Sequence, residues 1–518
     1  MFAGRRGLAG LAALIAVGLV GAGIAYARIQ PLVQGMVGYD MAASVLYFDR
    51  IVAGARLEGF VEATPKALLT VVDGLAMAAT RDWRSISVLA VLGYGLNIAL
   101  ATWLAARLGG LPAAGFAFVG MLSSSALLDD AAYAYAVGPA LTGWLVAGLA
   151  LTASRPRYLL AGIALALAGL ARYETVLLDG AAVAMLAGAV VVARLRGTTP
   201  PTRGAWWLAV GFASVLVEAL HDWLLTGDPF WAIEVSAIVS SFRRVLTLGN
   251  VVTLIWTHYR SGVLVIALAV VGALVLARGR RWAILAGIAV LVPGILAFQL
   301  ALAFKGTYVS NRYLYPADLG LVFAAAIGAG GAWSAAARRV LSGSGRERVG
   351  VPEVIGAVVA AGLGFVAVTM FTPLKPVTAR IATNQAIYAN AEAASQSLRA
   401  TLATESPGRL ARPANPDPRN RDRTNAALVV PVLLVPRLAV DLGLPVTQLA
   451  DSALPLVSPD GPVPRAGQLV VHESHLDRPV SAYAFLEVSA NARIGSITLD
   501  PLFVDAAAGI WVERVGGP

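Results

Sequence analysis

Long apolar runs separated by short polar stretches dominate the first 371 residues of the chain. A helix needs about 20 apolar residues to cross a bilayer, so this pattern predicts about eleven membrane-spanning helices. The run at residues 180–193 is shorter than the others. The predicted spans are residues 7–27, 86–106, 111–128, 132–153, 158–176, 180–193, 205–224, 252–277, 282–303, 313–334 and 352–371.

Arginines between the predicted spans indicate how the chain crosses the membrane. Under strict alternation the arginine-rich loops, such as those at Arg155 and Arg278, all fall on one side. The positive-inside rule makes that side the cytoplasm, with the N-terminus inside and the C-terminus outside. The opposite loops hold all three lysines and nearly all of the carboxylates, so we expect the chemistry outside.

The first outer loop, residues 28–85, carries two predicted helices that lie on the membrane surface. One begins at Tyr39-Asp40, and the other follows Pro65, a residue that favours the first helical turn. The span before this loop ends in Ala25-Tyr26-Ala27, which resembles a signal-peptidase site. Its apolar run is longer than that of a usual signal peptide, so we interpret it as an uncleaved anchor.

The chain changes character after residue 371. Residues 372–424 are predicted to form an amphipathic helix and a linker rich in Pro, Asn and Arg. Residues 425–518 predict a small α/β domain outside the membrane, with strands at 426–435, 468–472, 481–488 and 495–499 and a helix at 436–442. The predicted fold class is therefore an all-α polytopic membrane module, residues 1–371, with a small C-terminal α/β extracytoplasmic domain.

Composition supports the membrane assignment. The chain is 58% hydrophobic and 14% charged, with a mean hydropathy of +0.72, which excludes an ordinary soluble globular protein. It has no cysteine, which excludes disulfides and thiolate metal sites. The net charge of +10 comes almost entirely from arginine and fits contact with anionic headgroups. No basic soluble module is visible, so we expect no nucleic-acid partner.

Two aspartates in the first outer loop are candidates for a general base. Asp40 follows Tyr39 just after the first span, and Asp49 comes nine residues later. A carboxylate here could deprotonate an acceptor hydroxyl that attacks a sugar. Taken alone, Asp40 is explained more simply as a helix N-cap or a solvated loop acid.

Charged pairs lie at the outer ends of two spans. Asp129-Asp130 suggests a second acid or base, or a metal ligand, although a turn that keeps the loop in water would also need such residues. Arg172 and Glu174 follow an apolar run, and ionisable groups at this depth are often functional. A buried structural ion pair is the alternative for these two residues.

Cations and aromatic residues mark three further outer loops. Lys305 and Arg312 flank a short loop before Tyr313, where they would suit a lipid phosphate or simply anchor the helices to headgroups. His221-Asp222, at the outer end of the span at 205–224, and the polar turn with aromatics at Gly227 to Trp231 are placed in the outer loop, where the turn could shape a pocket. Another group, at the outer end of the next span, could instead be an aromatic belt: His258, Tyr259 and Arg260.

Taken together and in order, these stretches resemble the GT-C superfamily of integral-membrane glycosyltransferases. The similarity is to bacterial members related to protein mannosyltransferases, aminoarabinose transferases and mycobacterial-type arabinosyl or mannosyl transferases. It covers about residues 1–340 and not the tail. The stretches that carry it are Tyr39-Asp40, Ala63 to Thr70, Leu127 to Ala131, Gly169 to Glu174, Leu225 to Trp231 and Asn311 to Ala317.

The resemblance implies an inverting transfer from a polyprenyl-phosphate-linked sugar to a glycan, lipid or protein acceptor outside the bacterial cytoplasmic membrane. It implies Asp40 as the base, with Asp129 or Asp130 supporting the base or the acceptor, and Arg172, Lys305 and Arg312 as contacts of the donor phosphate. Some superfamily members need a divalent cation, Mg or Mn, and others need no metal. The implied substrate pocket comprises Tyr39, Asp49, Lys66, Glu174, His258, Tyr259, Arg260 and Tyr313.

The sequence departs from the family pattern in two places. Tyr173 stands where the family often has proline between arginine and glutamate. Many relatives have two adjacent acids in the first loop, whereas this chain has Asp40 with Asp49 nine residues on, so either could be the base. A flippase of lipid-linked sugars and a structural assembly subunit are the rival functions.

Overall fold

The computed structural model describes most of the membrane module and parts of the tail. The described residues are 5–33, 38–57, 61, 63–198, 203–242, 247–305, 311–341, 351–372, 378–379, 428–430, 435–442, 449–451, 469–473, 499–505 and 510–515. The predicted amphipathic helix and linker at residues 372–424 lie almost entirely outside this set. The chain forms two compact units. Unit 1 is residues 1–31, 87–217 and 245–379, and unit 2 is residues 32–86, 218–244 and 380–518.

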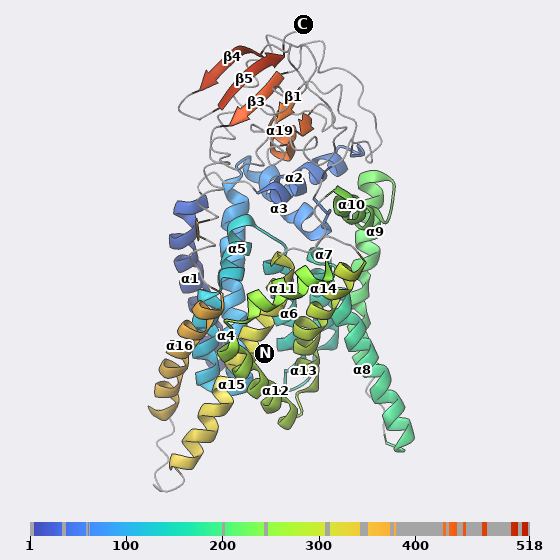
Figure 1. Ribbon diagram of the computed structural model, residues 1–518. Coiled ribbons are helices and arrows are strands. Elements are labelled where there is room, and N and C mark those ends of the chain that lie inside the picture. The colour runs from blue at the N-terminus through green and yellow to red at the C-terminus, as the bar shows by residue number, and fades with distance from the viewer. Residues whose placement is uncertain are drawn as a thin grey trace. The chain divides into compact units, whose positions relative to one another are not determined.

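Unit 1 is helical in all of its described regular structure (Figure 1). Its apolar helices are the product of the long hydrophobic runs, because a helix satisfies every backbone polar group internally. The elements are α1 (Arg5–Val33), α4 (Arg84–Ser123), α5 (Ser125–Tyr133), α6 (Val137–Leu151), α7 (Tyr158–Ala171), α8 (Thr175–Leu195), η1 (Arg203–Phe212), α9 (Ala213–Thr226, shared with unit 2), α11 (Leu248–Tyr259), α12 (Val263–Arg278), α13 (Trp282–Ala289), η2 (Val290–Gly294), α14 (Ile295–Phe304), η3 (Asn311–Leu314), α15 (Tyr315–Leu341) and α16 (Val351–Phe371).

Several predicted spans are joined or broken in the structure. The run at 86–106 and most of the run at 111–128 lie in helix α4, which loses helical geometry at Gly110, where φ is 77°. The end of the second run lies in α5. Helices α5 and α6 meet at 120°, and α11 and α12 meet at 87°. Among the described residues, six helices are long and apolar enough to cross a membrane, or eight if each bent pair is one span. The chain is therefore a multi-pass membrane protein, and the count of eleven spans stays a prediction.

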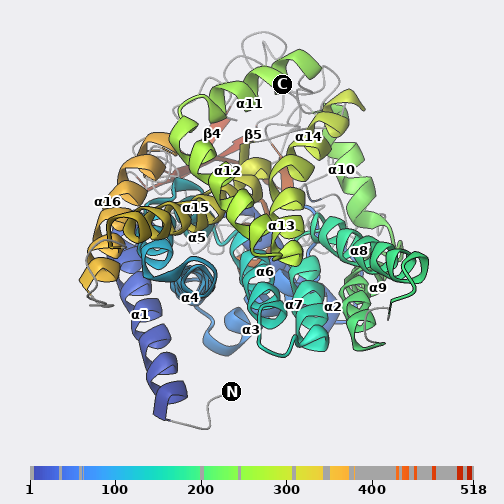
Figure 2. The same ribbon diagram turned by 90° about the horizontal axis from the view of Figure 1, so that it is seen from below.

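Close contact between α12 and α15 fixes the position of α15, the helix that begins at the candidate site. A Cβ atom at Gly328 of α15 would overlap the carbonyl oxygen of Leu268 of α12. A Cβ at Gly272 of α12 would in turn overlap the carbonyl oxygen of Ala324. Glycine lets the two backbones touch, as is common between helices in membranes. Figure 2 shows the two helices side by side from below.

Unit 2 contains the first outer loop, whose two predicted helices are present as α2 (Tyr39–Val52) and α3 (Ala67–Thr80). They pack closely, since a Cβ at Gly74 of α3 would overlap the ring of Phe48. The same unit holds the end of α9 and helix α10 (Trp231–Phe242). The Leu57 amide donates to the Leu225 carbonyl at 2.7 Å, which ties the loop to the end of α9.

The described tail residues form a sheet and one helix within unit 2. The sheet order is β2-β1-β3-β5-β4, with β1 parallel to β2 and β3, and with β5 antiparallel to β3 and β4. The predicted strand at 481–488 lies outside the described residues. Helix α19 packs its Arg437 over the ring of Trp83, 4.7 Å from the ring centroid. The elements are β1 (Leu428–Val430), α19 (Val435–Leu442), β2 (Leu449–Asp451), β3 (Leu469–Glu473), β4 (Leu499–Asp505) and β5 (Ile510–Val515).

Candidate active site

The first turn of α15 anchors the polar groups of unit 1. The hydroxyl of Tyr315 donates to Asp129 Oδ2 at 2.6 Å. One turn later, the fully buried Asp318 pairs with His258 Nε2 of α11 at 2.9 Å. Residues three apart on a helix lie on the same face. Tyr315 therefore ties the start of α15 to α5, and Asp318 ties it to α11.

Asp130 caps helix α6. Its two carboxylate oxygens accept from the backbone amides of Val137 at 2.9 Å and Gly138 at 2.6 Å. These amides have no partner within the helix, and an acid here also complements the helix dipole. Asp129 and Asp130 are 2% and 3% exposed inside α5. They do not form a turn that keeps a loop in water, because the chain bends only after Tyr133.

Arg172 and Glu174 form a buried two-point ion pair in the link between α7 and α8. The Nε and Nη2 atoms of Arg172 donate to the two carboxylate oxygens at 3.2 and 2.6 Å. Burial would lower the pKa of Arg172, but the charge of Glu174 outweighs it, and the pKa lies above its usual value. Asp130 and Tyr313 contribute to the same shift, so both lie near the guanidinium. Arg172 therefore stays charged.

Arg312 is held against aromatic faces in η3. Its guanidinium carbon lies 5.2 Å from the ring centroid of Tyr135 and 5.8 Å from that of Tyr313. Tyr135 in turn stacks on Tyr133 at 5.2 Å. We call Arg172, Glu174, Arg312 and Tyr313 the arginine cluster. It joins two of the three cations that the resemblance assigned to a donor phosphate.

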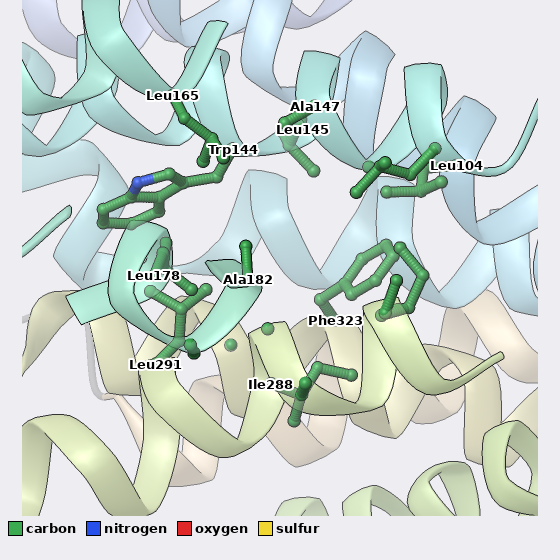
Figure 3. A pocket seen from close by; sticks show the side chains of 18 of the residues that line it. Leu104, Trp144, Leu145, Ala147, Leu165, Leu178, Ala182, Ile288, Leu291 and Phe323 are labelled. Atoms are coloured by element: carbon green, nitrogen blue, oxygen red, sulfur yellow. The ribbon is translucent and has the colours of Figure 1, made fainter. Parts of the chain in front are cut away.

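An apolar cavity of about 140 Å³ lies inside unit 1 (Figure 3). Its lining has no charged side chain and includes Trp144, Leu178, Leu291 and Phe323 from four elements. Two observations connect its rim to the arginine cluster. Pro316, which lies three residues after Tyr313 of the cluster, lines the cavity. The lining Trp144 also donates from Nε1 to Thr175, the residue after Glu174, at 3.2 Å.

The two candidate bases lie at opposite ends of helix α2 in unit 2. Asp40 is half-buried in the first turn, and Asp49 is exposed in the last turn. Nine residues of α-helix place them about 14 Å apart along the axis and on opposite faces. The buried hydroxyl of Tyr47 donates to the Ala63 carbonyl at 2.6 Å. Burial raises the pKa of Tyr47 well above its usual value, and the charges of Tyr39, Asp40 and Asp222 add to the shift.

Three ionisable residues of α9 form a group that was not predicted from the sequence. Glu218, His221 and Asp222 each offer one atom, and these atoms lie within 4.8 Å of one another. We call them the α9 cluster. His221 and Asp222 were predicted to lie in a loop, whereas helix α9 continues to Thr226. Their spacing of three and four residues was the readable signal, but Glu218 lies inside an apolar run and did not stand out.

Comparison with known proteins gives the fold a name. No family model matches the chain, and no curated protein matches it. The solved structure of the archaeal oligosaccharyltransferase AglB from Archaeoglobus fulgidus, in complex with an inhibitory peptide and a dolichol-phosphate, aligns at a TM-score of 0.53 and 13% identity. That alignment covers 97% of this chain and 74% of AglB. The chain has the GT-C fold.

The sequence resemblance to the GT-C superfamily is thus confirmed at the level of the fold. Apo ArnT from Cupriavidus metallidurans also aligns, at 14% identity and a TM-score of 0.49, over 99% of this chain and 100% of ArnT.

The remaining predicted site residues fall outside the arginine cluster. Lys66 is the N-cap residue of α3, with Nζ donating to the Thr64 carbonyl at 3.3 Å. Lys305 is exposed at the end of α14. Tyr259 is buried and stacks on Phe371 at 5.7 Å, whereas Arg260 is exposed. His258 and Tyr259 thus belong to the buried packing around Asp318 rather than to an aromatic belt.

Proposed function

We propose that the protein transfers a sugar from a polyprenyl-phosphate-linked donor to a hydroxyl of an extracytoplasmic acceptor. The observation that carries the proposal is the apolar cavity of unit 1, whose lining residues Trp144 and Pro316 link it to the arginine cluster through Thr175 and η3. A polyprenyl phosphate has the same two parts, an apolar tail and an anionic head. The GT-C fold supports this reading, and the AglB structure itself contains a dolichol-phosphate.

The arginine cluster suits the leaving phosphate. Guanidinium groups match phosphate oxygens with two parallel hydrogen bonds. Arg172 is held in place by Glu174, and Arg312 lies over two aromatic rings, so both are ordered before a ligand arrives. As the bond between the sugar and the phosphate breaks, negative charge grows on the phosphate. Fixed cations stabilise that charge without reorganising.

The apolar cavity suits the donor tail. Apolar side chains line it throughout, and α6, α7, α8, α13 and α15 contribute to it. Its volume accommodates only part of a long polyprenyl chain, and the rest of the tail would stay in the lipid. The gain from burying apolar surface would hold the donor with its phosphate at the rim.

Asp40 is the base in this proposal. It would accept the proton of the acceptor hydroxyl as that oxygen attacks the anomeric carbon from the face opposite the phosphate. The new bond between oxygen and carbon forms, and the phosphate leaves with the electron pair of the broken bond. The configuration at the anomeric carbon inverts. Asp40 is favoured over Asp49 because it is half-buried beside Tyr47, whereas Asp49 is exposed on the opposite face.

The test is transfer of radiolabelled sugar by the purified protein in nanodiscs. The donors are synthetic polyprenyl-phosphate mannose, arabinose, glucose and aminoarabinose, each offered with an envelope-glycan, lipid or peptide acceptor. Turnover with one donor, and the opposite anomeric configuration in the product, supports the proposal. No turnover with any donor, together with movement of lipid-linked sugar across liposomes, would replace the transferase with a flippase.

A further inference from the structure

The α9 cluster combines three metal-binding side chains on one face of a helix. His221 and Asp222 lie three and four residues after Glu218, a spacing that places both next to Glu218 on the helix surface. They are 6%, 6% and 2% exposed. Burying two carboxylates side by side is costly unless a counter-charge or hydrogen bonds compensate.

Each of the three side chains is oriented by a separate partner from another element of unit 2. Glu218 accepts from the Ala67 amide at the start of α3, at 3.1 and 3.3 Å. His221 Nε2 lies 3.2 Å from the Thr70 hydroxyl. Asp222 Oδ2 accepts from the Ala232 amide of α10 at 2.8 Å. Such outer contacts fix the direction of metal ligands in known sites.

These contacts leave two buried atoms that face each other. His221 Nδ1 and Asp222 Oδ1 have no hydrogen-bond partner and lie 3.5 Å apart. Two ligands of a tetrahedral zinc ion, with bonds of about 2.0–2.1 Å, are separated by roughly 3.4 Å. The spacing of the unpaired atoms thus matches a shared ion.

We propose that Glu218, His221 and Asp222 bind one divalent transition-metal ion, with zinc preferred. One imidazole nitrogen and two carboxylates are typical zinc ligands, and Mn²⁺ accepts the same set. Magnesium prefers oxygen ligands alone, so the histidine disfavours it. Three protein ligands leave a fourth position for water or another oxygen.

The ion would link three elements of unit 2. It would hold α9 to the start of α3 through Glu218 and to α10 through Asp222. Helix α3 packs on α2, which carries Asp40 and Tyr47. The proposed metal is thus a positioning element for the first outer loop. It would also reduce the negative charge that Asp222 places near Tyr47.

The experiment measures metal binding by the full-length protein in detergent. Metal is removed with a chelator, zinc is titrated back, and bound zinc is counted by mass spectrometry of the elements. We expect about one zinc per chain in the wild type. His221→Gln and Asp222→Asn should each weaken binding by at least about tenfold. His258→Gln is the matched control, because His258 also pairs with an aspartate but lies outside the α9 cluster.

Thermal unfolding of the same samples provides a second measurement. Zinc should raise the Tm of the wild type and of His258→Gln and leave the Tm of His221→Gln and Asp222→Asn unchanged. A wild-type protein that stays free of zinc at about 100 µM would overturn the proposal. So would equal zinc binding by the wild type and both cluster variants. Neither measurement uses glycosyl transfer, so this inference stands or fails separately from the proposed function.

Discussion

Two acids of unit 1, Asp129 and Asp130, differ from two acids of unit 2, Asp73 and Asp222, in how their carboxylate oxygens are hydrogen-bonded. In unit 1, Asp130 accepts hydrogen bonds from two backbone amides, and Asp129 accepts one from the Tyr315 hydroxyl. In unit 2, Asp222 and Asp73 each retain a buried oxygen with no hydrogen-bond partner. A buried carboxylate oxygen without a partner indicates either a ligand or a proton. We infer that Asp129 and Asp130 position the chain. Asp179 of unit 1 is also buried with no hydrogen-bond partner for either carboxylate oxygen, so the contrast holds between these residues and not between the two units as wholes.

The sharpest way to break this comparison is to remove one acid from each unit. Asp40→Asn should lower the rate of transfer by about 100- to 10,000-fold, the usual contribution of a general base. Asp129→Asn should lower it less, because an amide oxygen can still accept from Tyr315. The measurement is kcat with a saturating donor.

Asp49→Asn is the matched control for Asp40→Asn, since both acids lie on α2. It should leave kcat within about twofold of the wild type, because an exposed charge on the opposite face contributes little. A larger loss in Asp129→Asn than in Asp40→Asn would move the base to unit 1 and reverse the comparison.

The arginine cluster gives the next largest effect. Arg312→Ala should lower kcat/KM for the donor by about 10- to 100-fold, because a hydrogen bond to a charged phosphate is worth about 1.5–3 kcal/mol. Arg260→Ala, which removes an exposed arginine, is the control and should change kcat/KM little. Equal losses in both variants would point to a general charge effect rather than to a phosphate site.

Filling the cavity should produce a smaller change that depends on the donor tail. Leu291→Trp places a larger side chain in the cavity, and we expect about a tenfold lower kcat/KM for a long-tailed donor, or about 1.4 kcal/mol. A donor with a two-isoprene tail should be affected less. Leu274→Trp, at an exposed position on α12, controls for the added bulk. Equal losses for both tail lengths would remove the cavity from donor binding.

Sequence reasoning recovered the helices of the first outer loop because local signals mark them. Pro65 precedes α3, and apolar residues recur at helical spacing in it. The break between the spans at 111–128 and 132–153 was predicted at Asp129-Asp130, whereas the chain bends between Tyr133 and Val137, where Asp130 accepts from the amides of Val137 and Gly138. Hydropathy does not record such a contact, so the sequence placed the break a few residues too early.

The candidate site also combines residues that the sequence marks with features that only the tertiary structure reveals. Charged residues at the ends of apolar runs, such as Arg172 and Arg312, were visible because charges are rare in this chain. The cavity was not visible, because its lining consists of the same apolar residues that face lipid elsewhere. The α9 cluster was partly predictable. Its spacing of three and four residues is typical of one helix face, but Glu218 lies inside an apolar run and did not stand out.

Asp73 offers the finest test of the contrast between satisfied and unsatisfied acids. It is 3% exposed in α3, and burial raises the pKa of its carboxyl from 3.8 to about 8. The folded protein therefore keeps a proton that the unfolded chain loses above about pH 4. Stability should fall as the pH rises from about 4 to about 8, because the folded state binds more protons in that window.

Asp73→Asn should remove this dependence, because the amide is neutral at every pH. We expect the Tm of Asp73→Asn to exceed that of the wild type by a few degrees at pH 9 and to approach it at pH 5. Asp130→Asn should instead lower the Tm at both pH values. The asparagine side chain has only one oxygen to accept hydrogen bonds from the two backbone amides of α6, and loss of a helix cap costs about 1 kcal/mol. If both variants shift the Tm in the same direction at pH 9, the two acids are equivalent, and the division between satisfied and unsatisfied carboxylates loses its physical basis.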